Sequence, residues 1–180
     1  VFPYQPAGYW QYLNFPTRSW KADRGQLQYR RGLYTHWQRT FVHPSMLAFD
    51  APTREECVAQ RPVSNTPSAA LTLLNDPSFV EAARALGQRV IQEGGTTDIE
   101  RIHWLFQTVL SRRASENEMT KMIELLGQLK IQYAMDVKAA AELQAVGQFK
   151  LEPDVDIGQA SAWAMLGRAL LNVNEAICRN

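Results

Sequence analysis

The stretch TDIERIHWLFQTVLSRRASENEMTKMIELLGQLKIQY, residues 97–133, decides the fold class of this chain. It holds two capping boxes, Thr97 with Glu100 and Ser115 with Glu118, a pairing that satisfies backbone N–H groups at a helix start. After each box, apolar residues recur every three or four positions, which is the spacing of one helix face. The stretch therefore predicts two consecutive amphipathic helices. Their expected inward-facing residues are Ile102, Leu105, Phe106 and Val109, then Met119, Met122, Ile123, Leu126, Leu129 and Tyr133.

Similar start signals occur on both sides of this stretch. Thr66-Pro67 and Asp76-Pro77 each place a good N-cap residue before a proline at the first helical position. A shorter helix is expected over residues 136–146. The last helix is expected from about residue 156 to the C-terminus, with a stripe of Trp163, Leu166, Leu170, Val173 and Ile177. Residues 64–180 are thus predicted to form a five- or six-helix bundle, and the fold class is mainly α.

Residues 1–63 have a different texture, with six prolines and no sustained helical or strand period. Only the part over residues 29–40 is long enough for a regular element, and Leu33, Trp37 and Phe41 predict a short helix there. We expect the rest to be an extended, aromatic-anchored segment wrapped on the bundle. The chain then forms a single domain, residues 1–180, with parts 1–63 and 64–180.

Composition narrows the classes of protein. The chain has 180 residues, 46% of them hydrophobic, so a globular fold is expected. The net charge of +1 gives no bulk electrostatic reason to expect nucleic acid or an anionic membrane as partner. The sequence contains no run of about 18 apolar residues, so no membrane span is expected. The start at Val1, without an initiator Met or a leader, suggests a piece of a longer protein or a processed product.

Charge and polar side chains point to residues 30–66 as the candidate binding region. Residues 1–63 carry a net charge of +4 and residues 64–180 a net charge of −3. Arginine forks bind carboxylate, sulfate or phosphate, and irregular backbone on a rigid scaffold often carries binding groups. We predict that a polar pocket for an anionic or sugar-like ligand is formed by Arg39, His43, Asp50, Arg54 and Asn65. In the alternative, the arginines brace the irregular segment by pairing with its acids and backbone carbonyls.

Metal and cofactor signals are weak in this chain. Neither CxxC nor CxxCH occurs, so no zinc ribbon or c-type haem attachment is expected. Pro44 argues against one continuous helix that carries both His36 and His43. His103 lies in an amphipathic helix, where a histidine is more often packed or exposed than a metal ligand. No metal site is therefore predicted. Cys57 and Cys178 are equally compatible with one disulfide and with two free thiols.

Several long motifs carry a family resemblance. The run from YRRGLYTHWQRTFVHP to NDPSFVEAARAL, residues 29–86, resembles the planctomycete-specific C-terminal domain called domain of unknown function 1553. VFPYQPAGYW, LNFPTRSW, LSRRASENEM and AWAMLGRALLNVNEAICRN also match that family, so the resemblance spans essentially the whole chain. It implies the C-terminal part of a larger secreted protein, commonly with an upstream domain of unknown function 1549 and often a cytochrome c domain.

The resemblance sets the functional expectations. It implies a periplasmic or extracellular location, where a Cys57–Cys178 disulfide can persist. It favours an accessory or interaction domain of an envelope-associated protein, in a cytochrome-linked redox or a polysaccharide-processing assembly. Its partner would be the upstream domain or a separate subunit, and haem c would lie only in an upstream domain. The alternative is a catalytic or glycan- and anion-binding domain with its site in residues 30–66, and the residues leave open whether the chain is an enzyme.

Overall fold

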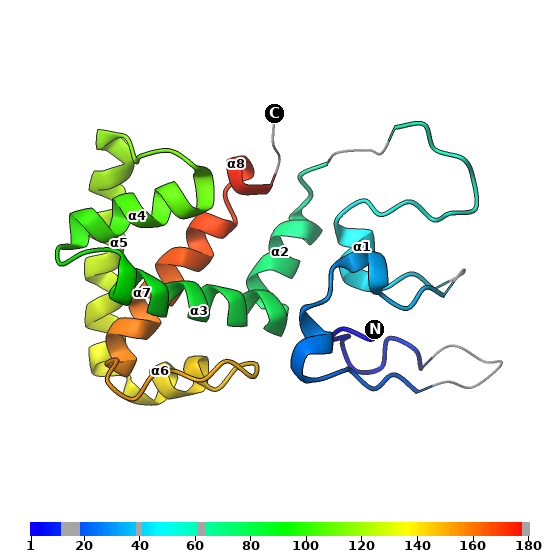
Figure 1. Ribbon diagram of the computed structural model, residues 1–180, viewed down its shortest axis with the longest axis horizontal. Coiled ribbons are helices and arrows are strands. Elements are labelled where there is room, and N and C mark those ends of the chain that lie inside the picture. The colour runs from blue at the N-terminus through cyan, green and yellow to red at the C-terminus, as the bar shows by residue number, and fades with distance from the viewer. Residues whose placement is uncertain (12–18, 39–40, 61–63, 178–180) are drawn as a thin grey trace. The chain divides into compact units, whose positions relative to one another are not determined.

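The computed structural model describes residues 1–11, 19–38, 41–60 and 64–177 (Figure 1). Within them the regular structure is helical and contains no strand, which confirms the mainly α fold class. Contacts between residues divide the chain into two compact units, Val1–Thr72 and Leu73–Asn180. This division falls inside α2 (Pro67–Asn75), whereas the sequence changes texture at residue 63. Among the described residues, no helix has both the length and the apolar character to cross a bilayer.

The second unit contains the predicted bundle. Its helices are α3 (Pro77–Glu93), α4 (Asp98–Leu110), α5 (Glu116–Met135), α6 (Val137–Gln144), α7 (Ile157–Leu171) and α8 (Asn174–Ile177). Both predicted capping boxes are present, at Thr97 and at Ser115. Asp76, Asp136 and Asp156 also accept the expected backbone N–H bonds at their helix starts.

One helix end differs from the prediction. The last helix does not continue to residue 177, because α7 ends at Leu171 and a separate short helix follows. Asn172 and Asn174 are poor helix formers, which weakens the helix at this point. Glu175 of α8 is bound by Arg112 from the loop after α4, at 2.7 Å. A tertiary contact therefore supports the break that the apolar stripe did not reveal.

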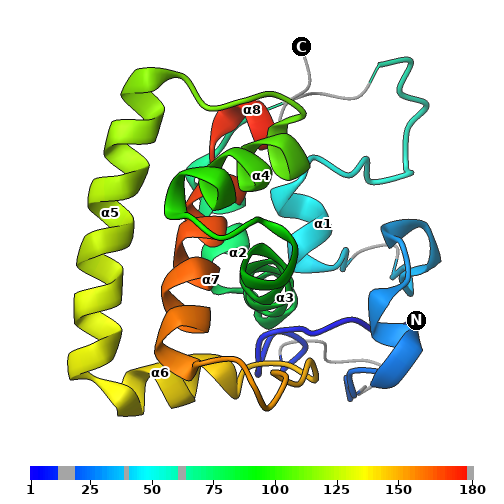
Figure 2. The same cartoon turned by 60° about the vertical axis from the view of Figure 1, so that its left-hand side comes forward.

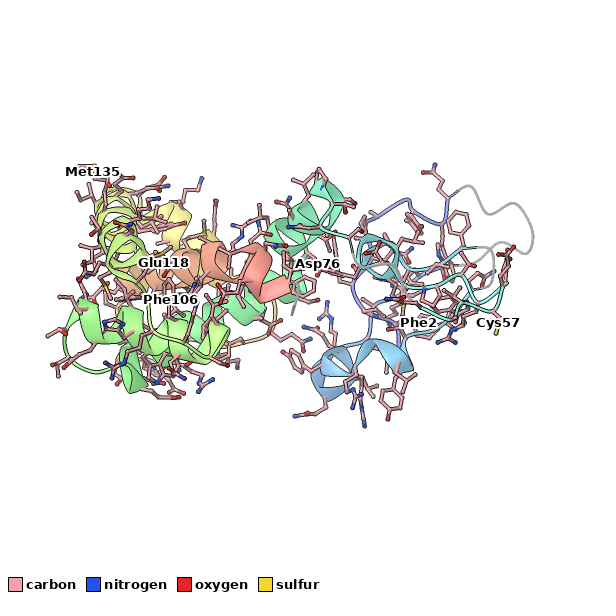
Figure 3. All side chains as sticks on the ribbon, turned by 90° about the horizontal axis from the view of Figure 1, so that it is seen from above. Phe2, Cys57, Asp76, Phe106, Glu118 and Met135 are labelled. Carbon is pink, nitrogen blue, oxygen red and sulfur yellow. The ribbon has the colours of Figure 1, made fainter. Side chains whose placement is uncertain are left out.

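Helix α7 is the centre of the bundle and lies between α3 and α5 (Figure 2). Its predicted stripe residues Trp163, Leu166 and Leu170 are buried. The α4 residues Ile102, Leu105 and Phe106 pack in the same core, and Figure 3 shows Phe106 among these helices. Small residues let the other helices approach α7, and those that are buried are Ala160, Ser161, Ala162, Ala164 and Gly167.

The predicted inward face of α5 includes more residues than the structure buries. Leu126, Leu129 and Tyr133 are buried, but Ile123 is 41% exposed. Exposed Ile131 and Met135 continue the same i+4 ridge as Ile123. The neighbouring helices cover only part of the apolar surface of α5, and sequence periodicity does not show where that cover ends.

A buried polar row on α3 holds the connection between α6 and α7. The Glu81 carboxylate accepts the Gln148 N–H at 2.8 Å, and the Gln88 side-chain oxygen accepts the Glu152 N–H at 3.0 Å. Arg84, only 1% exposed, donates to the Val146 carbonyl and to the Phe149 carbonyl. Burial lowers the pKa of Arg84, and nearby Glu81 acts in the opposite direction. These three side chains supply the partners that an irregular loop cannot find in its own backbone.

The first unit contains only short elements before α2. They are two 3-10 helices, η1 (Gly25–Tyr29) and η2 (Gly32–Tyr34), and the helix α1 (Pro44–Ala48). The predicted helix over residues 29–40 is therefore wrong within the described part of that range. Arg30 and Arg31 interrupt it with extended ψ values before η2, and Thr35 is extended after η2. The wrapping of residues 1–63 on the bundle stays a prediction.

Candidate functional site

An aromatic and histidine cluster forms the interior of the first unit. Phe2 stacks on His36 with ring centroids 4.8 Å apart, and Trp20 meets Phe2 and Trp10 edge-on, each at 4.9 Å. The Trp20 indole N–H donates to the Pro3 carbonyl at 2.8 Å. Aromatic pairs of this geometry contribute about 0.5–1.5 kcal/mol each beyond their burial. Rings from distant parts of the segment thus replace the helix packing that the segment lacks.

His43, a predicted ligand-binding residue, belongs to this interior. Its side chain is only 4% exposed, and its ring lies 5.5 Å from that of Trp20. Its Nε2 is 2.8 Å from the Tyr4 carbonyl oxygen, which accepts the hydrogen bond and so places the proton on Nε2. His43 therefore ties the N-terminal stretch of the chain to the start of α1.

Asp50, the second predicted site residue, closes a loop. Its carboxylate accepts the Ser64 backbone N–H at 2.8 Å and the Ser64 hydroxyl at 2.6 Å. Its backbone has a φ of 55°, in the left-handed region where Asp is one of the few tolerated side chains. The two ends of the segment between residues 50 and 64 are held together by this carboxylate.

Arg54 lies in that loop and faces an aromatic ring. Its guanidinium is 4.2 Å from the centre of the Trp37 ring, a cation–π distance, and its φ of 62° is also left-handed. Asn65 is exposed beside the start of α2, and Arg39 lies outside the described residues. His43, Asp50 and Arg54 thus contact three different parts of the first unit. A pocket shared by the five predicted residues stays a prediction.

Cys57 is exposed, and Figure 3 shows it at the outer edge of its loop. Cys178 lies outside the described residues. The predicted Cys57–Cys178 pairing therefore stays a prediction.

An exposed surface on η1 and η2, which we call the 25–34 face, was missed by the sequence prediction. Leu33, expected on the inner side of a helix, is 68% exposed. Leu27, Tyr29 and Tyr34 are exposed at 47, 58 and 55%, and Arg30 and Arg31 are exposed between them. The sequence signals for it were Gly25 and Gly32, which begin η1 and η2, and the large apolar residues that follow each glycine. Tyrosine and arginine are enriched at protein interfaces.

Histidine, cysteine and acidic side chains do not gather into a metal-binding group of three anywhere in the described part of the chain. That this chain holds no metal and no cofactor stays an expectation, because the lack of such a group among the described residues does not test it.

A comparison with models of known protein families gives one match. The family model described as PSD1, protein of unknown function (DUF1553), matches residues 1–126. The chain belongs to the DUF1553 family. No curated protein and no solved structure matches it. The DUF1553 match covers the whole first unit, α3 and α4, and ends inside α5. The five predicted ligand-binding residues and the 25–34 face all lie within the matched region.

Proposed function

We propose that this DUF1553 chain is an accessory interaction domain that binds another polypeptide through the 25–34 face. The observation that carries the proposal is the exposure of four large apolar side chains, Leu27, Tyr29, Leu33 and Tyr34, within one short segment. Burying a side chain of this size against a partner contributes about 1.5–3 kcal/mol. Exposed apolar side chains gathered in one place mark interaction sites, whereas scattered ones do not.

The end of the face at η2 is held by contacts within its own unit, which favours binding. The Thr35 N–H donates to the Gly32 carbonyl at 3.1 Å, and the His36 N–H donates to the Val1 carbonyl at 2.8 Å. His36 is in turn stacked on Phe2. A partner would meet a preformed surface, so little conformational entropy would be lost from this side of the complex.

A capture experiment tests the proposal. The tagged chain is cross-linked in cells that produce it, and the double variant Leu33→Ser, Tyr34→Ser is compared with Leu71→Ser. Leu71 is a matched control because it is 57% exposed but lies on α2. We expect the same partner, in fixed proportion, with the wild type and with Leu71→Ser, and its loss with the double variant. Equal recovery with all three proteins would overturn the proposal.

The setting of this interaction is part of the same proposal. We infer an exported, envelope-associated protein whose partner is an upstream domain or a separate subunit of a redox or polysaccharide-processing assembly. The family resemblance in the sequence supports this setting. Fractionation of producing cells tests it: recovery of the full-length protein outside the cytoplasm is expected, and recovery only in the cytoplasm would contradict it.

A second candidate function, binding of a glycan or anion, is favoured by one contact. Arg54 presents its guanidinium over Trp37, and arginine and aromatic side chains are the groups that hold anionic sugars. Titration with an anionic oligosaccharide, followed by tryptophan fluorescence, should give saturable quenching that Arg54→Gln abolishes. An unchanged spectrum would remove this candidate.

A further inference from the structure

The charged side chains in and next to the 25–34 face, over residues 24–49, have one sign. Residues 24–49 contain four arginines and no aspartate or glutamate. The acids at the two ends of this range bind within the unit: the Asp23 carboxylate accepts the Phe2 N–H at 2.7 Å, and Asp50 binds Ser64. Within residues 24–49 every charged side chain is therefore positive, and the flanking acids hold contacts inside the unit.

The arginines of the face are available to a partner. Arg30 and Arg31 are exposed, and neither forms an ion pair with any described residue. The Arg30 guanidinium lies 5.9 Å from the centre of the Tyr34 ring, which keeps it beside the apolar part of the face. Two arginines of the second unit differ, since Arg89 is paired with Glu93 and Arg112 with Glu118 and Glu175. Opposite charge across an interface increases the association rate and selects the partner.

The apolar residues decide which class of anion fits. Leu27 and Leu33 gain free energy only where aliphatic or aromatic side chains cover them. The hydroxyl and acid groups of an anionic polysaccharide do not provide such cover, whereas a polypeptide can carry carboxylates and apolar side chains together. The arrangement of Arg30 and Arg31 between Tyr29 and Leu33 matches an acidic polypeptide.

Resting on the proposed function, we propose that the partner presents an acidic segment, in which aspartate or glutamate carboxylates pair with Arg30 and Arg31. Apolar side chains of the same segment pack on Leu33 and Tyr34. The tight, bidentate geometry of arginine with carboxylate would fix the register of this segment on the face.

Labelled peptides test the charge preference with the full chain. One probe alternates Glu with Leu and Tyr, and the second has Gln in place of every Glu; fluorescence anisotropy measures each Kd. We expect the Glu peptide to bind about 10-fold more tightly than the Gln peptide, a difference of about 1.4 kcal/mol. Raising NaCl from about 50 to about 300 mM should reduce that difference, because salt screens exposed charges.

Charge-matched variants assign the effect to the face. Arg30→Gln with Arg31→Gln should abolish the preference for the Glu peptide. Arg89→Gln with Arg113→Gln also removes two exposed positive charges, but from the second unit, and should leave it unchanged. Loss of the preference in both double variants would overturn the proposal, since it would show a net-charge effect.

Three other outcomes would also overturn the proposal of an acidic partner, and they distinguish its failure from a failure of the proposed function. Equal binding of both peptides, or binding of neither, would reject an acidic partner, while partner capture lost in Leu33→Ser, Tyr34→Ser would still support a polypeptide partner. Polygalacturonate that binds more tightly than the Glu peptide, with the same loss in the Arg30, Arg31 variant, would assign the face to an anionic polysaccharide.

Discussion

Gly87 on α3 shows how one residue sets the distance between two helices. A Cβ atom at this position would lie 2.6 Å from the Ala164 backbone nitrogen and 2.9 Å from its Cα, so α3 and α7 approach here backbone to backbone. We expect Gly87→Ala to destabilise the chain by about 1–3 kcal/mol, because the two helices must move apart. Urea unfolding measures the change.

Gly127 on α5 provides the matched control for Gly87. Nothing lies within 4 Å of its added Cβ. Gly127→Ala should therefore stabilise the chain by about 0.5–1 kcal/mol, because alanine loses less conformational entropy in a helix. If both substitutions changed the urea midpoint in the same direction, the close approach of α3 and α7 would not be the cause.

Glu118 links charge to stability at the start of α5. Arg112 binds it at 2.7 Å, and the Ser115 N–H adds a backbone bond, which together lower the pKa of Glu118 from 4.5 to about 2. Since this folded-state pKa lies below that of the unfolded chain, Glu118 stabilises the fold above pH 4.5, and this contribution is lost as the pH falls toward 2. Because both side chains are partly exposed, the ion pair contributes only about 0.2–1 kcal/mol to the stability of the fold.

Thermal unfolding across this acidic range tests the role of Glu118. The melting temperature of Glu118→Gln should fall less between pH 4.5 and 2 than that of the wild type. Glu116→Gln changes the same helical turn but leaves the bond to Arg112 in place, and should follow the wild type. Parallel curves for wild type and Glu118→Gln would contradict the prediction.

At the scale of the element, α3 both packs in the core and anchors the loop between α6 and α7. Arg84→Ala would leave the Val146 and Phe149 carbonyls and the buried Glu81 without their cationic partner. We expect the free energy of unfolding to fall by about 3–5 kcal/mol, the range for removing one partner of a buried charged contact. Urea unfolding gives the stability, and hydrogen exchange should show faster exchange of the Gln148 and Phe149 amides.

Arg89 is the control on the same helix. Its side chain is 51% exposed and forms one i,i+4 pair with Glu93. Arg89→Ala should therefore cost no more than about 0.5 kcal/mol and leave exchange in the loop unchanged. Equal effects of the two alanine substitutions would show that burial of Arg84 is unimportant.

At the scale of the whole molecule, the second unit carries a core of its own. Every residue of the main hydrophobic cluster lies within residues 86–173, and includes Phe106, Leu126 and Trp163. We expect residues 73–180, produced alone, to keep helical circular dichroism and a cooperative urea transition. A fragment that lacked cooperative unfolding would show that the first unit is required for this core to form.

The helices of the bundle and their starting points could be predicted from local patterns in the amino-acid sequence. Capping boxes at Thr97 and Ser115 and the stripe of Trp163, Leu166 and Leu170 depend on local hydrogen bonds and on helical spacing. Such signals act over a few residues, so they can be recognised without knowing what surrounds them. The same holds for the family, because its motifs are runs of residues.

Which side chains those helices bury depends on how the helices pack against one another. Ile123 and Leu126 belong to the same apolar pattern, yet one is exposed and the other buried, because burial depends on the neighbouring helix. His43 and Asp50 have chemistry suited to a binding site, but their positions give them Tyr4 and Ser64 as partners. Leu33 belonged to the predicted inner side of a helix, yet it lies on the short helix η2 and is exposed together with Tyr34. Contacts between residues far apart in the chain determine these outcomes, and no local pattern encodes them.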